Sequence, residues 1–89
     1  MRKPVYTSAF KQDWKRVSKR GYDMDKLKKV IGLLVNDEPL PTEYRDHQLT
    51  GDLKSHRELH IEPDWLLIYK IAGDDCIFAH TGTHSDLFK

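Results

Sequence analysis

The chain has 89 residues, of which 38% are hydrophobic and 33% charged. These are the proportions of one soluble globular domain covering residues 1–89. Cys76 is the only cysteine, which excludes an internal disulfide and a thiolate metal cage and favours a reducing, cytoplasmic setting. No apolar run approaches the roughly 20 residues that span a bilayer, so we expect no membrane partner.

The formal net charge of +1 conceals an asymmetry between the two halves of the sequence. Residues 1–30 contain ten lysines and arginines against three acidic residues, whereas residues 31–89 contain five against eleven. A basic half of this kind is typical of a solvated helix face. It is also typical of a surface that meets phosphate backbones or an acidic partner protein, and the sequence leaves both interpretations open.

The N-terminal half predicts a strand followed by two helices. Residues 3–7 predict a short edge strand, where Pro4 is tolerated because an edge strand need not donate every ladder bond. Ser8 is a suitable N-cap for a helix that ends at Gly21, and Asp23 can cap a second helix, so the two form an antiparallel hairpin. Apolar side chains at helical spacing mark the buried faces: Phe10, Trp14 and Val17, then Met24, Leu27, Val30, Ile31 and Leu34.

The second half predicts a loop and then three strands. Pro39 and Pro41 prevent helix continuation, so residues 36–50 are expected to be loop. Short turn-forming links join the predicted strands and dictate antiparallel neighbours. The middle strand is apolar on both faces and is expected to be central in the sheet. The strands cover 53–61, 65–71 and 76–82. The expected fold is α+β, with an N-terminal edge strand and a two-helix hairpin packed on a small antiparallel sheet.

All five histidines lie in the second half of the chain: His47, His56, His60, His80 and His84. Histidine exchanges protons near neutrality, because its unperturbed pKa is about 6.5. Three interpretations are open: metal ligands, metal-free acid–base catalysis, and solvated or structural histidines. The spacing matches no compact metal-binding motif.

Strand alternation predicts where these histidines point. Arg57 shares a face with Leu59. If Leu59 faces the helices, His56, Glu58 and His60 project from the open face of the sheet. In the last strand, alternation places three side chains on one face: Cys76, Phe78 and His80.

Three blocks of sequence are similar to a known family. Residues 46–51 read Asp-His-Gln-Leu-Thr-Gly, residues 57–70 contain His-Ile-Glu-Pro-Asp-Trp, and residues 81–88 read Thr-Gly-Thr-His-Ser-Asp-Leu-Phe. Together they resemble the YafQ-like branch of the RelE/ParE toxin superfamily, the ribosome-dependent mRNA endonucleases of bacterial type II toxin–antitoxin pairs. The resemblance implies a RelE-like, microbial-ribonuclease-like fold. It also implies no cofactor and, as partners, a cognate antitoxin, the ribosome and mRNA, with no DNA bound by the toxin alone.

The resemblance also implies site residues. It assigns proton transfer and catalysis to four side chains: His84, His60, Asp64 and His47. Substrate contacts are expected from five more: Trp65, Phe88, Arg57, Lys54 and His80. Of these, Trp65 and Phe88 would stack on bases, with core packing as the alternative, above all for Trp65 at the start of a buried strand. Phosphate contacts would come from His47 and from Lys54 or Arg57. His80 departs from the pattern, since an arginine is expected there, and a histidine would make phosphate stabilisation depend on pH.

The implied reaction is metal-free. The 2′-OH of the mRNA would attack the adjacent phosphate, leaving a 2′,3′-cyclic phosphate and a 5′-OH, with His84 as the general acid and Asp64 orienting a histidine. An alternative is a catalytically weakened homologue that acts mainly by binding an antitoxin or the ribosome, which the change at His80 would permit. A ParE-like inhibitor of DNA gyrase is disfavoured, because it would not need these histidines.

Overall fold

A five-stranded sheet forms the centre of the molecule, which a computed structural model describes over residues 1–88. In chain order its strands are β1 (Lys3–Tyr6), β2 (His47–Gln48), β3 (Arg57–Glu62), β4 (Trp65–Ala72) and β5 (Asp75–Gly82). The helices are α1 (Ser8–Lys19), α2 (Met24–Val35) and the short α3 (His84–Leu87), and the 3₁₀ turns are η1 (Thr42–Tyr44) and η2 (Gly51–Leu53). The predicted α+β class is confirmed. No helix in the described part of the chain is long and apolar enough to cross a bilayer.

The two long helices begin and end for local reasons. The Thr7 hydroxyl accepts a hydrogen bond from the backbone N–H of Phe10, so Thr7 and not Ser8 is the N-cap of α1. Gly21 adopts a φ of +83° just after α1, a conformation that favours glycine. The side chain of Asp23 caps α2 as predicted, and the four-residue link gives the expected hairpin.

The sheet order is β1-β5-β4-β3-β2, and β4 lies at its centre as predicted. The neighbouring pairs are antiparallel except at the edge formed by β1, which runs parallel to β5. Two boundaries in the second half were predicted wrongly. β3 begins at Arg57 rather than at residue 53, because residues 51–53 form η2. Within the expected loop, β2 adds a two-residue strand beside β3.

A β-bulge changes the face on which His80 lies. Phe78 is opposite Tyr69 and His80 is opposite Ile68, so Ala79 is an extra residue in β5. The extra residue reverses the alternation. His80 therefore lies on the opposite face of the sheet from Phe78, and the predicted shared face is wrong.

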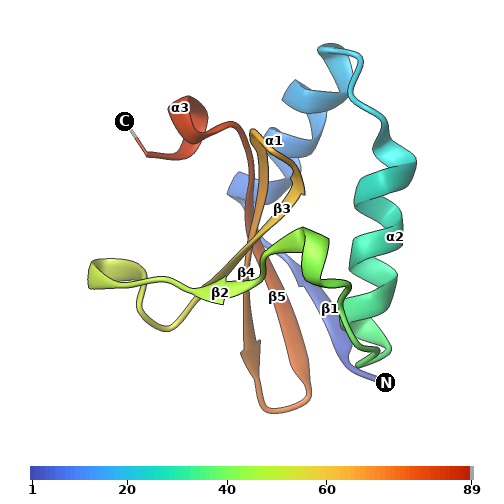
Figure 1. Cartoon of the computed structure of the whole chain (residues 1–89), viewed down its shortest axis with the longest axis vertical. Coiled ribbons are helices and arrows are strands. Elements are labelled where there is room, and N and C mark those ends of the chain that lie inside the picture. Colours follow the sequence, from blue (N-terminus) through green and yellow to red (C-terminus); the bar gives the residue numbers. More distant parts are fainter. Residues whose placement is uncertain (89) are drawn as a thin grey trace.

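The two faces of the sheet are covered differently (Figure 1). Both long helices pack on one face, where the main core gathers side chains from α1, α2, β3, β4 and β5. On the other side lie α3 and the β2–η2 segment. Leu66 and Ile68 are buried on this second face, and so are Glu58 and His60, so it is more enclosed than an open sheet surface.

Candidate active site

Four aromatic rings form a row on the second face of the sheet. Adjacent ring centroids are 6.2 Å apart for His47 and His60, 5.9 Å for His60 and His84, and 6.3 Å for His84 and Phe88. His47 comes from β2 and His60 from β3. His84 is the first residue of α3, and Phe88 is the residue that follows this helix. The fold thus brings together three of the predicted histidines and the predicted stacking residue Phe88.

His84 is oriented by a carboxylate. Asp64 Oδ1 accepts two hydrogen bonds from this residue, one from the backbone N–H at 3.1 Å and one from Nδ1 at 2.9 Å. These bonds hold the pKa of Asp64 below its ordinary range, so the carboxylate stays charged. With Nδ1 occupied, Nε2 of the half-exposed His84 ring is the nitrogen available to a substrate.

The short helix that carries His84 is tied to the rest of the fold. Thr83 and Asp86 form a reciprocal capping box at its start. Arg20, the residue that follows α1, donates to both carboxylate oxygens of Asp86, at 2.7 and 3.0 Å. The Arg20 bonds hold the pKa of Asp86 well below its ordinary range. A Cβ at Gly82 would come within 2.9 Å of Asp86 Oδ2, so only glycine allows this close approach.

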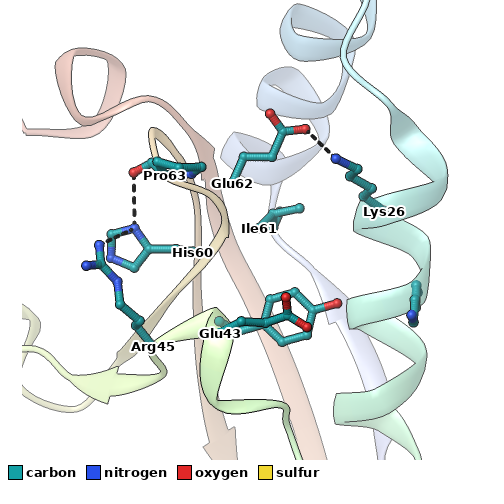
Figure 2. A pocket seen from close by; sticks show the side chains of 9 residues that line it. Lys26, Glu43, Arg45, His60, Ile61, Glu62 and Pro63 are labelled. Atoms are coloured by element: carbon teal, nitrogen blue, oxygen red, sulfur yellow. Dashed lines mark hydrogen bonds and ion pairs between the residues drawn. The ribbon is translucent and has the colours of Figure 1, made fainter.

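His60 is nearly buried, and oxygen atoms face both of its ring nitrogens. Nδ1 lies 3.2 Å from the carbonyl oxygen of Pro63, and Nε2 lies 3.4 Å from Oε1 of the buried Glu58. A third group, the Arg45 guanidinium, approaches with Nη2 at 3.5 Å from Nδ1 (Figure 2). The carbonyl oxygen only accepts hydrogen bonds, so it favours a proton on Nδ1; the Arg45 guanidinium, which only donates, then contacts the ring without a hydrogen bond to that nitrogen.

His47 is more open than His60. Its Nδ1 lies 2.8 Å from the carbonyl oxygen of Arg45, which again fixes the proton on Nδ1. The ring is exposed, so Nε2 presents a lone pair to the solvent. The two outer histidines of the row therefore both offer Nε2, and each is held through Nδ1.

Trp65 belongs to the core, which corrects the role expected from the sequence. Its side chain is 2% exposed, its ring meets Tyr22 edge-on, and its Nε1–H donates to Thr81 Oγ1 at 3.0 Å. Burial on the helix-bearing face leaves no ring surface for a nucleotide base. Trp65 is buried with the strand that it opens, so core packing, the alternative to stacking, is its role.

The position of Arg57 also corrects the role expected from the sequence, a phosphate contact. It lies opposite Tyr69 in the register, on the helix-bearing side of the sheet, whereas the histidine row lies on the other side. Its guanidinium donates to Asp46 Oδ2 at 2.8 and 3.1 Å, and Asp46 also accepts from the Tyr69 hydroxyl. Arg57 is therefore engaged in a structural ion pair away from the row.

The remaining predicted residues lie around the row without joining it. Lys54 is exposed just after η2. His56 precedes β3, and burial lowers its pKa, which favours the neutral ring. His80 Nδ1 lies 3.2 Å from Oδ2 of the buried Asp13, which also binds Arg16 and accepts from the backbone N–H of Thr81. Position 80 is thus tied to α1.

Two neighbours of the row, Arg45 and Glu58, were missed by sequence reasoning. Arg45 stands two residues before His47, so the motif around that histidine could have drawn attention to it. Glu58 was placed on the correct face without a role. Among residues 1–88, no three His, Cys, Asp or Glu side chains are grouped as the ligands of a metal ion would be.

Comparison with known proteins identifies the family. A family model described as a bacterial toxin of a type II toxin–antitoxin system, YafQ, matches residues 2–89. The chain belongs to the YafQ toxin family. This YafQ-family chain is 46% identical over 84 residues to the mRNA interferase toxin YafQ of Escherichia coli strain K12, an alignment covering 93% of this chain and 91% of the relative.

Solved structures agree with the YafQ fold. The E. coli DinJ–YafQ complex contains a chain that matches with a TM-score of 0.93 and 44% identity, and both chains are covered completely. A metal-bound toxin from Helicobacter pylori matches with a TM-score of 0.92 and 39% identity, over 99% of this chain and 100% of that one. The family resemblance inferred from the three sequence blocks is confirmed, and so is the fold.

Proposed function

We propose that this chain is a ribosome-dependent mRNA interferase, which cleaves mRNA by metal-free acid–base catalysis and is neutralised by a cognate antitoxin. The name of the E. coli relative supports the activity, and the DinJ–YafQ complex supports the partner. The observation that carries the proposal is the row of three histidines ending at Phe88, with His84 fixed by Asp64. Fixed imidazoles are suited to moving protons at neutral pH.

The reaction needs a base and an acid on opposite sides of the phosphate, because the attacking and leaving oxygens stand in line. His47 and His84 each neighbour the His60 ring, which supports a pair of proton-transfer groups with the phosphate between them. We assign the base to His47, whose free Nε2 takes the proton of the 2′-OH as the 2′-oxygen bonds to phosphorus. His84 donates its Nε2 proton to the 5′-oxygen as the P–O5′ bond breaks.

Asp64 acts through His84 and is a positioning residue. A His84 ring that carries two protons keeps one on Nδ1 for the carboxylate and presents the other on Nε2. An ionised Asp64 is a poor base, and its lowered pKa makes it poorer still. Phe88, 43% exposed beside His84, is suited to stack on a base of the mRNA.

The basic surface of the hairpin is suited to ribosomal RNA. Lys11, Lys15 and Lys19 are all exposed on α1, and lysines that neutralise phosphates contribute salt-dependent affinity. A toxin that receives its mRNA from the ribosome needs little affinity for free RNA, which agrees with the net charge of +1.

The reaction is tested by incubating the protein with translating ribosomes in EDTA and mapping new mRNA ends. We expect 5′-OH ends paired with 2′,3′-cyclic phosphates, and none on the same mRNA without ribosomes. Cleavage that requires added metal would overturn the mechanism. Ribosome binding without cleavage would favour the weakened homologue.

A further inference from the structure

A cavity opens beside His60 at the edge of β3. The histidine row lies on one side of this edge and the cavity on the other. Its volume is about 430 Å³, and it lies between β3, α2 and η1. Figure 2 shows His60 and Arg45 on one side of it and the Lys26–Glu62 ion pair on the other, with Ile61 between them. The cavity edge at Arg45 and His60 is therefore shared with the cleavage site.

Arg45 is held in an unusual position at this shared edge. Its φ of +49° is uncommon for a residue with a side chain, and such conformations gather at functional sites. The same residue contacts two histidines of the row, through its carbonyl oxygen to His47 and through its guanidinium to His60. One residue thus contacts both rings.

The Arg45 guanidinium has no carboxylate partner within 4.0 Å among residues 1–88. An unpaired guanidinium beside an imidazole favours the binding of an anion. A guanidinium can bind a phosphate through two parallel hydrogen bonds. His80 stands where the family resemblance implies an arginine, and it is tied to Asp13. Arg45 is positioned to supply a permanent positive charge from the other end of the site.

The walls of the cavity are suited to a nucleoside. Ile61, Pro63 and the ring of Tyr44 supply apolar surface, and Lys29 adds a positive charge. The volume falls in the range of small-molecule sites, about 300–1,000 Å³. Single-stranded RNA can turn a base out of its stack into such a pocket.

We infer that Arg45 and this cavity form a subsite for the nucleotide next to the cleaved phosphate. Arg45 holds the phosphate of that nucleotide, and its nucleoside enters the cavity beside Tyr44. The inference rests on the proposed function for the identity of the ligand, and it names a place where base preference is set.

The test is an NMR titration of the full chain with a 2′-O-methyl adenosine trinucleotide, which has no free 2′-OH and cannot be cleaved by internal attack. We expect the backbone amides of residues 43–45 and 60–62 to shift. Arg45→Gln should weaken binding about tenfold, with Arg45→Lys in between. Lys28→Gln removes the same charge on the α1-facing side of α2 and should leave the affinity unchanged.

Shifts confined to the histidine row, equal affinity of Arg45→Gln and wild type, or no binding at all would each overturn the subsite. The titration needs no cleavage, so its result is independent of the proposed reaction. A wild-type chain that binds through the cavity yet produces no 5′-OH ends on ribosomes would refute the reaction and leave the subsite standing.

Discussion

Oxygen atoms decide which nitrogen of each histidine is free. The Arg45 carbonyl holds His47 through Nδ1 and leaves its Nε2 free, and the Asp64 carboxylate does the same for His84. In His60 both nitrogens face oxygen atoms, those of Pro63 and Glu58. A carbonyl leaves a neutral ring with Nε2 as an acceptor, which suits a base. A carboxylate also stabilises a second proton on the ring, which suits an acid.

The assignment of the base predicts a change in the pH–rate profile of His47→Gln. The wild-type rate should fall at low pH because the base becomes protonated. The His47→Gln rate should be about 10²-fold lower at its maximum and should lose this acidic limb, since no base remains to be protonated. His60→Gln is the matched control and should keep the acidic limb. If the limb is lost in His60→Gln and kept in His47→Gln, His60 is the base.

The burial of Trp65 predicts an effect on stability rather than on RNA. Trp65→Phe removes the hydrogen bond to Thr81 and leaves a small void, so we expect a loss of about 1–3 kcal/mol in the free energy of unfolding. The cleavage rate of the folded protein should change little. Denaturant unfolding and ribosome-bound cleavage measure the two effects. If Trp65→Phe keeps the wild-type stability and loses cleavage, Trp65 contacts RNA and is not a core residue.

At the level of elements, the position of His84 depends on one turn of helix. α3 has only four residues, too few to be stable alone, so its place depends on the capping box and on Arg20. The ion pair joins α1 to α3 across 66 residues of sequence. The proposed general acid, His84, is therefore sensitive to contacts far from the reacting atoms.

The Arg20–Asp86 pair predicts a pH-dependent contribution to stability. Because folding lowers the pKa of Asp86, the contribution is complete above the ordinary carboxyl range, near pH 4 and higher. It is lost as the pH falls toward the lower pKa of the folded state. The Tm of wild type should exceed that of Asp86→Asn at pH 7, and the difference should shrink below about pH 4. A difference that is constant or grows toward low pH would contradict the assignment.

The elements also show where sequence reasoning succeeds. The helical hairpin, the edge strand and the central β4 follow from local capping and apolar spacing, and all were predicted. The bulge at Ala79 was not, because an extra residue is set by pairing with β4 and leaves no local signal. For the same reason alternation misplaced His80. The face of Arg57 was read correctly, but its pairing with Asp46 depends on a segment that the sequence left as loop.

For the molecule as a whole, the main core and the proposed catalytic site lie on opposite faces of the sheet. The helix-bearing face holds the main core, whereas α3 and the β2–η2 segment lie on the other side (Figure 1), and the histidine row is on that side. The three motif blocks predicted which histidines meet, because family resemblance carries tertiary information that periodicity lacks. Arg45 was missed because its role arises only where β3 and η1 come together.

The basic face of α1 predicts a salt-dependent ribosome contact. Changing Lys11, Lys15 and Lys19 to Glu should weaken ribosome association. It should also make that association less dependent on salt: the slope of the logarithm of the association constant against the logarithm of the salt concentration should become shallower by about 0.7–0.9 for each phosphate that the protein no longer neutralises. Gln at the same positions should give a smaller decrease in affinity, since the charge change is half as large. Sedimentation with ribosomes across a salt series measures both. Association unaltered in the Glu variant would exclude this face from the ribosome interface.

The central claim is that His84 donates a proton in a metal-free cleavage of mRNA. The most direct measurement is the single-turnover rate of cleavage on ribosomes in EDTA, for wild type and His84→Ala. We expect wild type to cleave under these conditions and His84→Ala to be slower by about 10²–10⁴-fold with unchanged ribosome binding. Equal rates for the two proteins would contradict this claim.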